Sequence, residues 1–171
     1  MKALVIYESL YGNTETIARA IAEGLRKKFD VTVADVGTMP RAFGMNLLVV
    51  GGPTHAFGMS RPSTREQAAQ QGTVRPQAID VGVREYLDCS PMLAGLAAAA
   101  FDTKVDKPFL PGSAAHRAQR GLRRLGCHIV LPAESFLVSG SAGPLKADEE
   151  ERARKWGTAL AAAVTAAKHT V

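Results

Sequence analysis

The sequence predicts an α/β domain in which a parallel sheet of five strands carries helices on both faces. Short apolar runs alternate along the chain with segments whose apolar residues recur at helical spacing, which is the pattern of strand–helix–strand units. The chain has 171 residues and 46% of them are apolar, so it is long enough to bury a core of its own. No internal repeat or linker divides it, and we expect one domain over residues 1–171.

The predicted strands are, in order, residues 2–7, 29–35, 47–50, 97–101 and 128–131, with 136–138 as a candidate continuation of the last. Residues 2–7 and 47–50 contain continuous apolar runs, which suit a strand buried on both faces of a parallel sheet. Residues 29–35 alternate between apolar and polar side chains. The four alanines of 97–101 favour a helix by propensity, and we predict a strand there from its place in the pattern.

The predicted helices are residues 14–28, 113–125 and 148–168. Each carries an apolar stripe, which in the first helix consists of Ile17, Ala18, Ile21, Ala22 and Leu25. The long segment between the third and fourth strands is predicted to be a helical insertion at about residues 59–91. It is expected to hold two short helices, near residues 64–71 and 82–88.

The loop between the first strand and the first helix is the strongest candidate for a binding site. Such a loop offers free backbone N–H groups and the positive end of a helix dipole. Ser9, Asn13 and Thr14 add side-chain donors, and Gly12 allows close approach of a ligand. The loop has no Lys or Arg and matches neither GxxxxGK[ST] nor GxGxxG, so one terminal phosphate is the predicted ligand. Simple helix capping is the alternative, although one hydroxyl is enough for that.

Residues 7–15 resemble the FMN phosphate loop of flavodoxins and flavodoxin-like proteins, whose usual pattern is Ser/Thr-x-Thr/Ser-Gly-x-Thr. Three residues match this pattern, and Tyr11 departs from it at the middle hydroxyl position. The resemblance in strand order covers nearly the whole chain. It implies a flavodoxin-like, doubly wound sheet in the order 2-1-3-4-5, with FMN as the cofactor. The loop residues that it implies as FMN contacts are Ser9, Leu10, Tyr11, Gly12, Asn13 and Thr14.

The resemblance implies a second flavin loop within residues 51–59, whose Pro-Thr-x-x-Phe-Gly segment is similar to that of flavin-binding quinone reductases. The implied contacts are Pro53, Thr54, His55, Ala56, Phe57 and Gly58. His55 or Phe57 is expected to lie against one face of the flavin ring. The alternatives are a solvated loop histidine and a core or lid phenylalanine.

A third flavin loop is implied at residues 101–109, with Asp102 and Thr103 at the ring edge, Lys104 beside them and Phe109 as a candidate for the second ring face. Flavodoxins usually have a glycine-rich, often acidic segment with a stacking tyrosine at this place. This chain has no tyrosine in the segment and no glycine before Gly112. This difference predicts that FMN is held less tightly than in a typical flavodoxin.

The formal net charge is +5, from 21 Lys and Arg against 16 Asp and Glu, whereas typical flavodoxins are strongly acidic. Positive charge near the flavin favours its reduced, anionic form, so we expect a higher reduction potential than in an acidic flavodoxin. The helix at 113–125 places Arg117, Arg120 and Arg124 on one face. That face is either a docking surface for an acidic redox partner or an ordinary solvated surface. No nucleic-acid-binding motif accompanies it, so nucleic acid is not an expected partner.

Other chemistry does not assemble from the sequence. Four isolated histidines have no metal-ligand spacing, and residues 140–143 are not a GxSxG motif, so we expect neither a metal nor a catalytic acid, base or nucleophile. Cys89 and Cys127 are read as reduced thiols of a cytoplasmic protein. No apolar run has the length of a membrane span or a signal peptide, so a membrane is not an expected partner.

These features predict an electron-transfer protein that binds FMN non-covalently and exchanges electrons with a separate redox protein or reductase, with a small-molecule acceptor as a further candidate. One alternative is an FMN-dependent NAD(P)H:quinone-type oxidoreductase. Another is an interaction module of the same fold that has lost FMN. The insertion at 59–91 either covers the flavin site as a lid or fills it.

Overall fold

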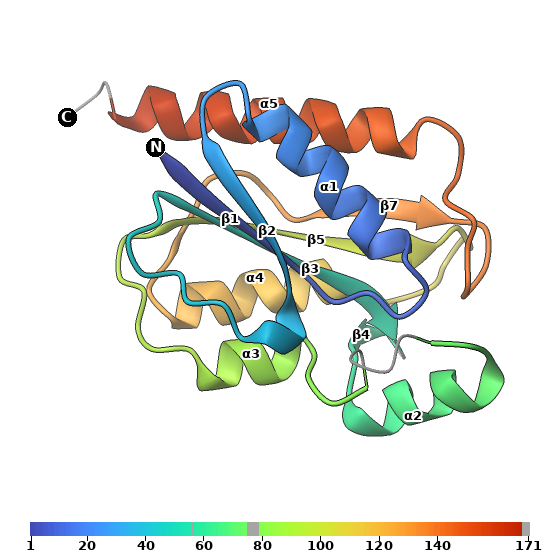
Figure 1. The fold of residues 1–171 in the computed structure, drawn as a ribbon. Coiled ribbons are helices and arrows are strands. Elements are labelled where there is room, and N and C mark those ends of the chain that lie inside the picture. The colour runs from blue at the N-terminus through green and yellow to red at the C-terminus, as the bar shows by residue number, and fades with distance from the viewer. Residues whose placement is uncertain (56, 75–78, 169–171) are drawn as a thin grey trace.

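The computed structural model describes residues 1–55, 57–74 and 79–168, and it confirms the α/β fold class. A twisted sheet lies between two layers of helices (Figure 1). Helices α1 (Asn13–Leu25) and α5 (Glu149–Lys168) pack side by side on one face. Helices α3 (Val83–Cys89) and α4 (Ala114–Arg124) cover the other face.

The parallel strands run in the order predicted. They are β1 (Lys2–Tyr7), β2 (Asp30–Asp35), β3 (Leu47–His55), β5 (Ala97–Val105), β6 (His128–Ile129) and β7 (Glu134–Val138). The order across the sheet is β2-β1-β3-β5-β6, and β7 pairs with β5 further along the same edge. Since β6 and β7 are two segments of the predicted fifth strand, this is the order 2-1-3-4-5. The short β4 (Gly58–Met59) folds back antiparallel onto the end of β3.

Two central strands extend beyond their predicted ends. Both β3 and β5 have nine residues and stay paired as far as Pro53 and Thr103. The first residues of the predicted second and third flavin loops therefore belong to these strands. Strand pairing holds them rigidly at the carboxyl edge of the sheet. The alanines at the start of β5 pair residue by residue with Leu47–Val50 of β3, and burial in the sheet overrides their helical propensity.

The core has one part on each side of the sheet. Under α1 and α5, the rings of Phe101, Phe136 and Trp156 meet edge to face, with ring centroids 6.2–6.4 Å apart. The second part lies under α3 and α4 and contains Tyr86 and Leu122. None of the helices described combines the length and apolar content that crossing a membrane requires.

The insertion contains two helices, as predicted, with slightly different ends. Helix α2 (Pro62–Gln71) begins two residues before its predicted start, with proline in the first turn, where no intrahelical N–H bond is lost. It stands apart from both helix layers, beside β4 and the carboxyl ends of the strands (Figure 1). A single 3₁₀ turn, η1 (Val36–Thr38), follows β2.

Candidate functional site

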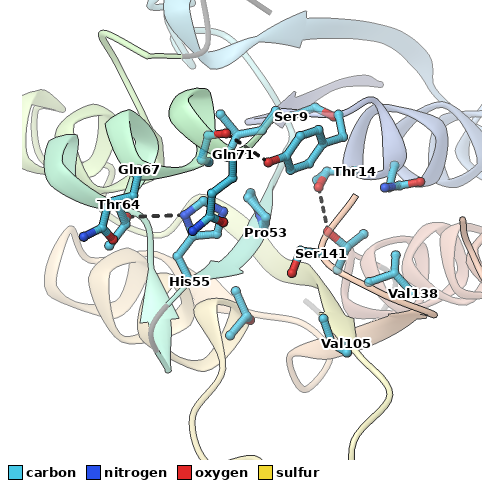
Figure 2. Close-up of a pocket in the computed structure, with 16 residues that line it drawn as sticks. Ser9, Thr14, Pro53, His55, Thr64, Gln67, Gln71, Val105, Val138 and Ser141 are labelled. Atoms are coloured by element: carbon cyan, nitrogen blue, oxygen red, sulfur yellow. Dashed lines mark hydrogen bonds between the residues drawn. The ribbon is translucent and has the colours of Figure 1, made fainter. Parts of the chain in front are cut away.

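A cavity of about 250 Å³ opens at the carboxyl edge of the sheet, beside the first strand, where the strand order reverses. In open α/β sheets this is the place where ligands bind. Its lining residues are Ser9, Leu10, Tyr11, Asn13, Thr14, Pro53, Thr54, His55, Thr64, Gln67, Ala68, Gln71, Thr103, Val105, Val138 and Ser141. Figure 2 shows Thr64 and Gln67 on one side and Val105 and Val138 on the other. None of the lining residues within the described part of the chain is acidic, and none is Lys or Arg.

The predicted phosphate loop forms one end of this cavity. Gly12 is the N-cap of α1 and has φ 101°, a conformation that favours glycine. Its N–H donates to Ser9 Oγ at 3.0 Å, which fixes the loop. Because Gly12 has no side chain to accept a hydrogen bond, it leaves the first N–H groups of α1 for an incoming anion.

Contacts from distant segments hold this loop in place. The hydroxyls of Thr14 and Thr103 lie 2.7 Å apart, and both residues are buried. Asn13 Nδ2 donates to the carbonyl of Ala142 at 3.1 Å. A Cβ on Gly143 would lie 2.7 Å from the Asn13 side chain, so this contact requires glycine. The N-terminus of α1 is thus held between β5 and the loop after β7.

The predicted second loop contributes three residues to the cavity, Pro53, Thr54 and His55. His55 Nδ1 lies 3.3 Å from Thr64 Oγ1, and burial, with a smaller contribution from the charge of Arg65, lowers the pKa of His55 (Figure 2). At neutral pH the ring is therefore uncharged. Of the other predicted residues, Phe57 points outward and is 51% exposed, and Gly58 is buried outside this cavity. The predicted contact Ala56 lies outside the described residues.

The third loop departs most from the expected arrangement. Thr103 lines the cavity, whereas Asp102 is fully buried beneath it. Asp102 Oδ2 accepts hydrogen bonds from Thr54 Oγ1 (2.9 Å), Ser113 Oγ (2.6 Å) and the Ala115 N–H (3.0 Å), so this carboxylate fixes the start of α4.

The remaining predicted residues of the third loop lie away from the cavity lining. Lys104 Nζ donates to the carbonyls of Leu110 and Gly112, at 3.0 and 2.8 Å, and thereby holds the loop closed on itself. Phe109 is fully exposed. The segment therefore brings a threonine and Val105 to the cavity, but no aromatic ring.

Helix α2 supplies a wall that the sequence reasoning did not identify. Thr64, Gln67, Ala68 and Gln71 line the cavity from this helix. The signal was present, because Thr64, Gln67 and Gln71 recur at i, i+3 and i+7 and therefore share one face. The insertion forms a side of the cavity and leaves the space beside it open. Val138 and Ser141, from β7 and the loop after it, were also not identified.

A buried ionic network fastens α2 to the phosphate loop. Arg65 has no exposed surface and donates to Ile79 O, Ser60 Oγ and Glu85 Oε1, each at 2.8 Å. Its Nη1 lies 3.8 Å from Oε1 of Glu8, the residue that precedes the loop. The Ser60 hydroxyl also donates to Glu8.

The carboxylates of this network have opposite pKa shifts. Burial raises the pKa of Glu8, and hydrogen bonds from Ser60 and the Val83 N–H offset part of that effect. Burial acts in the same direction on Glu85, but hydrogen bonds from Arg65 and the Gly82 N–H outweigh it and lower its pKa. Glu85 is therefore the stable, ionised counterion of Arg65. Ionisation of Glu8, by contrast, is unfavourable because its carboxyl group is buried.

Residues 5–88 match the family model described as flavodoxin. This match, over just under half of the chain, supports a flavodoxin-like family for the protein. Flavodoxins bind FMN, so the family match and the structural neighbours support the predictions of family and cofactor.

Solved structures agree on the fold. An archaeal flavodoxin is 22% identical, with a TM-score of 0.68, and the match covers 96% of this chain and 99% of that one. Flavodoxin 1 of Bacillus cereus is 20% identical, with a TM-score of 0.66 and coverage of 94% and 97%. A Streptococcus pneumoniae flavodoxin is 20% identical, with a TM-score of 0.67 and coverage of 95% and 99%. No curated protein matches the sequence.

The chemistry of the cavity fits FMN at the phosphate end. The first turn of α1 offers N–H donors behind a glycine cap, and the donors around it are uncharged, which suits a single terminal phosphate. Pro53, His55 and Val105 offer flat or apolar surface for the rings. The third loop fits less closely, because its aromatic residue is directed into solvent.

Proposed function

We propose that this chain binds FMN non-covalently in the cavity of about 250 Å³ and works as an electron-transfer protein. The observation that carries the proposal is the glycine-capped start of α1, open toward a cavity lined by uncharged donors. Its partners are a separate redox protein or reductase, with a small-molecule acceptor as a further candidate. The two free cysteines suit a cytoplasmic protein.

When bound, FMN supplies the one- and two-electron redox chemistry. The residues of this chain bind and orient it. The N–H groups of Asn13 and Thr14 would hold the phosphate, and Pro53 and His55 would lie against the rings. The α2 wall keeps water away from one side of the cavity. Among the described residues at the cavity, none is needed as a catalytic acid or base.

The test compares FMN with riboflavin, which lacks the phosphate, by quenching of flavin fluorescence. Asn13→Asp places a negative charge in the first turn of α1, where it repels a phosphate. We expect FMN affinity to fall at least tenfold and riboflavin affinity to change less than threefold. Asn46→Asp is the matched control, because Asn46 Oδ1 accepts a hydrogen bond from the Lys2 N–H near the opposite edge of the sheet and an aspartate keeps that acceptor.

Failure of the wild-type protein to bind FMN at high micromolar concentration would overturn the proposal and favour the interaction-module alternative. An equal loss of FMN and riboflavin affinity in Asn13→Asp would trace the effect to the lost hydrogen bond with Ala142 O and not to a phosphate at the start of α1.

The oxidoreductase alternative has one structural feature in its favour, namely a second, small cavity that shares His55 and Thr64 with the first and is also lined by Arg61, Arg84 and Arg117. Steady consumption of NAD(P)H with a quinone by the FMN-loaded protein alone would support this alternative. Reduction only in the presence of a separate reductase supports the carrier.

A further inference from the structure

A second, smaller cavity of about 30 Å³ lies beside the first. His55 and Thr64 line both cavities, and the contact between their side chains forms part of the boundary between them. The other lining residues are Gly58, Met59, Arg61, Arg84 and Arg117. None of these belongs to the predicted phosphate loop.

Three guanidinium groups converge on this cavity from three elements. Arg61 is the N-cap of α2, Arg84 lies in α3 and Arg117 lies in α4. Within residues 1–55, 57–74 and 79–168, no carboxylate forms an ion pair with any of the three. Glu8 and Glu85, the acidic residues of the buried network, already pair with Arg65. Three like charges in one place repel one another, and an anion would remove that cost.

Arg84 is held in position by hydrogen bonds, whereas Arg61 and Arg117 are exposed. Arg84 donates through Nε to Ser60 O (3.3 Å) and through Nη2 to Met59 O (3.0 Å). Arg117 lies across Gly58, where an added Cβ would be 2.6 Å from Arg117 Nε. Arg84 is partly buried, and it still has N–H donors beyond those two bonds. Prearranged guanidinium donors favour phosphate and carboxylate groups.

We propose that this cavity is an oxyanion subsite that binds the phosphate or carboxylate group of a small redox substrate while the rest of that substrate lies against the neighbouring cavity. The substrate assignment rests on the proposed function, whereas oxyanion binding does not. The small volume and the shared His55–Thr64 boundary favour one terminal group beside the flavin cavity over an extended partner surface.

The first experiment titrates the protein with inorganic phosphate and follows backbone amide signals by NMR. Phosphate in the subsite is expected to shift Gly58 and Met59, whereas phosphate at the start of α1 shifts Gly12 and Asn13, so the two sites are read separately. The double variant Arg84→Gln/Arg117→Gln should weaken phosphate binding at Gly58 at least tenfold. Arg120→Gln/Arg123→Gln, the same charge change at exposed positions of α4, should weaken it less than twofold.

The absence of a saturable shift at Gly58 and Met59 in the wild-type protein would overturn the subsite. Equal weakening in both double variants would also overturn it, because a general basic surface would then explain the binding. If Arg84→Gln/Arg117→Gln does not fold, Gly58→Ala serves instead, because its Cβ would displace only the flexible end of Arg117.

A second experiment tests the substrate class with a carboxylated naphthoquinone, its uncharged parent and an acidic peptide. We expect inorganic phosphate to displace the carboxylated quinone and not the parent compound. Stronger displacement of phosphate by the peptide than by the quinone would assign the subsite to a protein partner and overturn the proposal. FMN affinity is measured in parallel, so a protein that binds phosphate at Gly58 but not FMN contradicts the proposed function and leaves the oxyanion site intact.

Discussion

Glu8 lies between the first strand and the phosphate loop, and only 1% of its surface is exposed. Its N–H bonds to Gly51 O at 2.9 Å, and Oε2 accepts from the Val83 N–H at 3.1 Å. The side chain thus joins the loop to the insertion. Nothing in the sequence around Glu8 indicates this role, because the hydrogen-bond partners of its side chain lie 52 to 75 positions away.

The raised pKa of Glu8 makes a prediction about pH. Above its ordinary value of 4.5, the folded protein retains a proton that the unfolded chain has lost, so the free energy of unfolding falls as pH rises through that window. Glu8→Gln removes this loss. Its stability relative to wild type should therefore improve as the pH rises above the ordinary value of 4.5, as measured by urea unfolding.

The control for Glu8→Gln is Glu66→Gln, which changes an exposed carboxylate of α2 and should keep the wild-type pH profile. A constant difference between Glu8→Gln and wild type at all pH values would contradict the prediction.

Asp102 is predicted from the sequence to contact the flavin, whereas its hydrogen bonds indicate a structural role. Asp102→Asn weakens three hydrogen bonds that hold Thr54 and the start of α4, so we expect a loss of about 1–3 kcal/mol in unfolding free energy. Because the side chain lies beneath the cavity, the FMN dissociation constant should change less than threefold. Asp106→Asn, at an exposed position, is the control. A tenfold loss of FMN affinity without a loss of stability would place Asp102 at the flavin.

At the scale of elements, α1 and α5 pack unusually closely through two glycines. A Cβ on Gly157 would lie 2.2 Å from Ile21 O, and a Cβ on Gly24 would lie 2.1 Å from Arg154 O. The neighbours are backbone atoms, which cannot move aside. The sequence places these glycines within amphipathic helices, but only the packed structure shows why they are required.

Gly157→Ala should therefore destabilise the protein by about 1–3 kcal/mol through overpacking, although alanine is the better helix former. Gly121→Ala in α4 is the matched control, since its Cβ would meet the end of the Leu87 side chain, which can turn away. Its effect should be near zero. Thermal and urea unfolding measure both variants, and equal effects would contradict the packing argument.

Helix α2 depends on one buried arginine. Apart from Arg65, Ala68 is the only residue of this helix that is buried. Arg65→Met should release α2 and increase thermolysin cleavage between residues 61 and 74 severalfold, because Glu8 and Glu85 lose their shared cation. The sheet should stay folded by circular dichroism. Arg26→Met, at an exposed position after α1, is the control and should leave the cleavage rate unchanged.

At the scale of the whole molecule, the net charge of +5 sets the field around an uncharged cavity. We expect the midpoint potential of bound FMN to lie above that of free FMN and to fall as salt is raised from 20 to 500 mM, because salt screens the positive field. Spectroelectrochemical titration measures both values. A midpoint potential below that of free FMN would contradict this prediction.

Two charge reversals locate the source of that field. Lys107→Glu changes a residue of the third loop and should lower the potential. Lys27→Glu makes the same change just beyond the far end of α1, about 20 Å along the helix from the cavity, and should lower it less. Equal shifts would show that net charge alone acts.

The apolar pattern was sufficient to predict the layered α/β fold, because strands of a buried parallel sheet and amphipathic helices have different periods. It also located the phosphate loop, since Ser9, Gly12 and Thr14 are close in sequence and lie together at one helix start. Local chemistry of this kind can be read from a short segment.

The tertiary structure alone decided which side chains meet across the sheet. It buried Asp102 under α4, directed Phe109 into solvent and brought the α2 wall to the cavity. It also gathered Arg61, Arg84 and Arg117 from three elements into one place. These contacts join chain segments that are 11 or more positions apart, and their distance in space follows from packing rather than from any local preference.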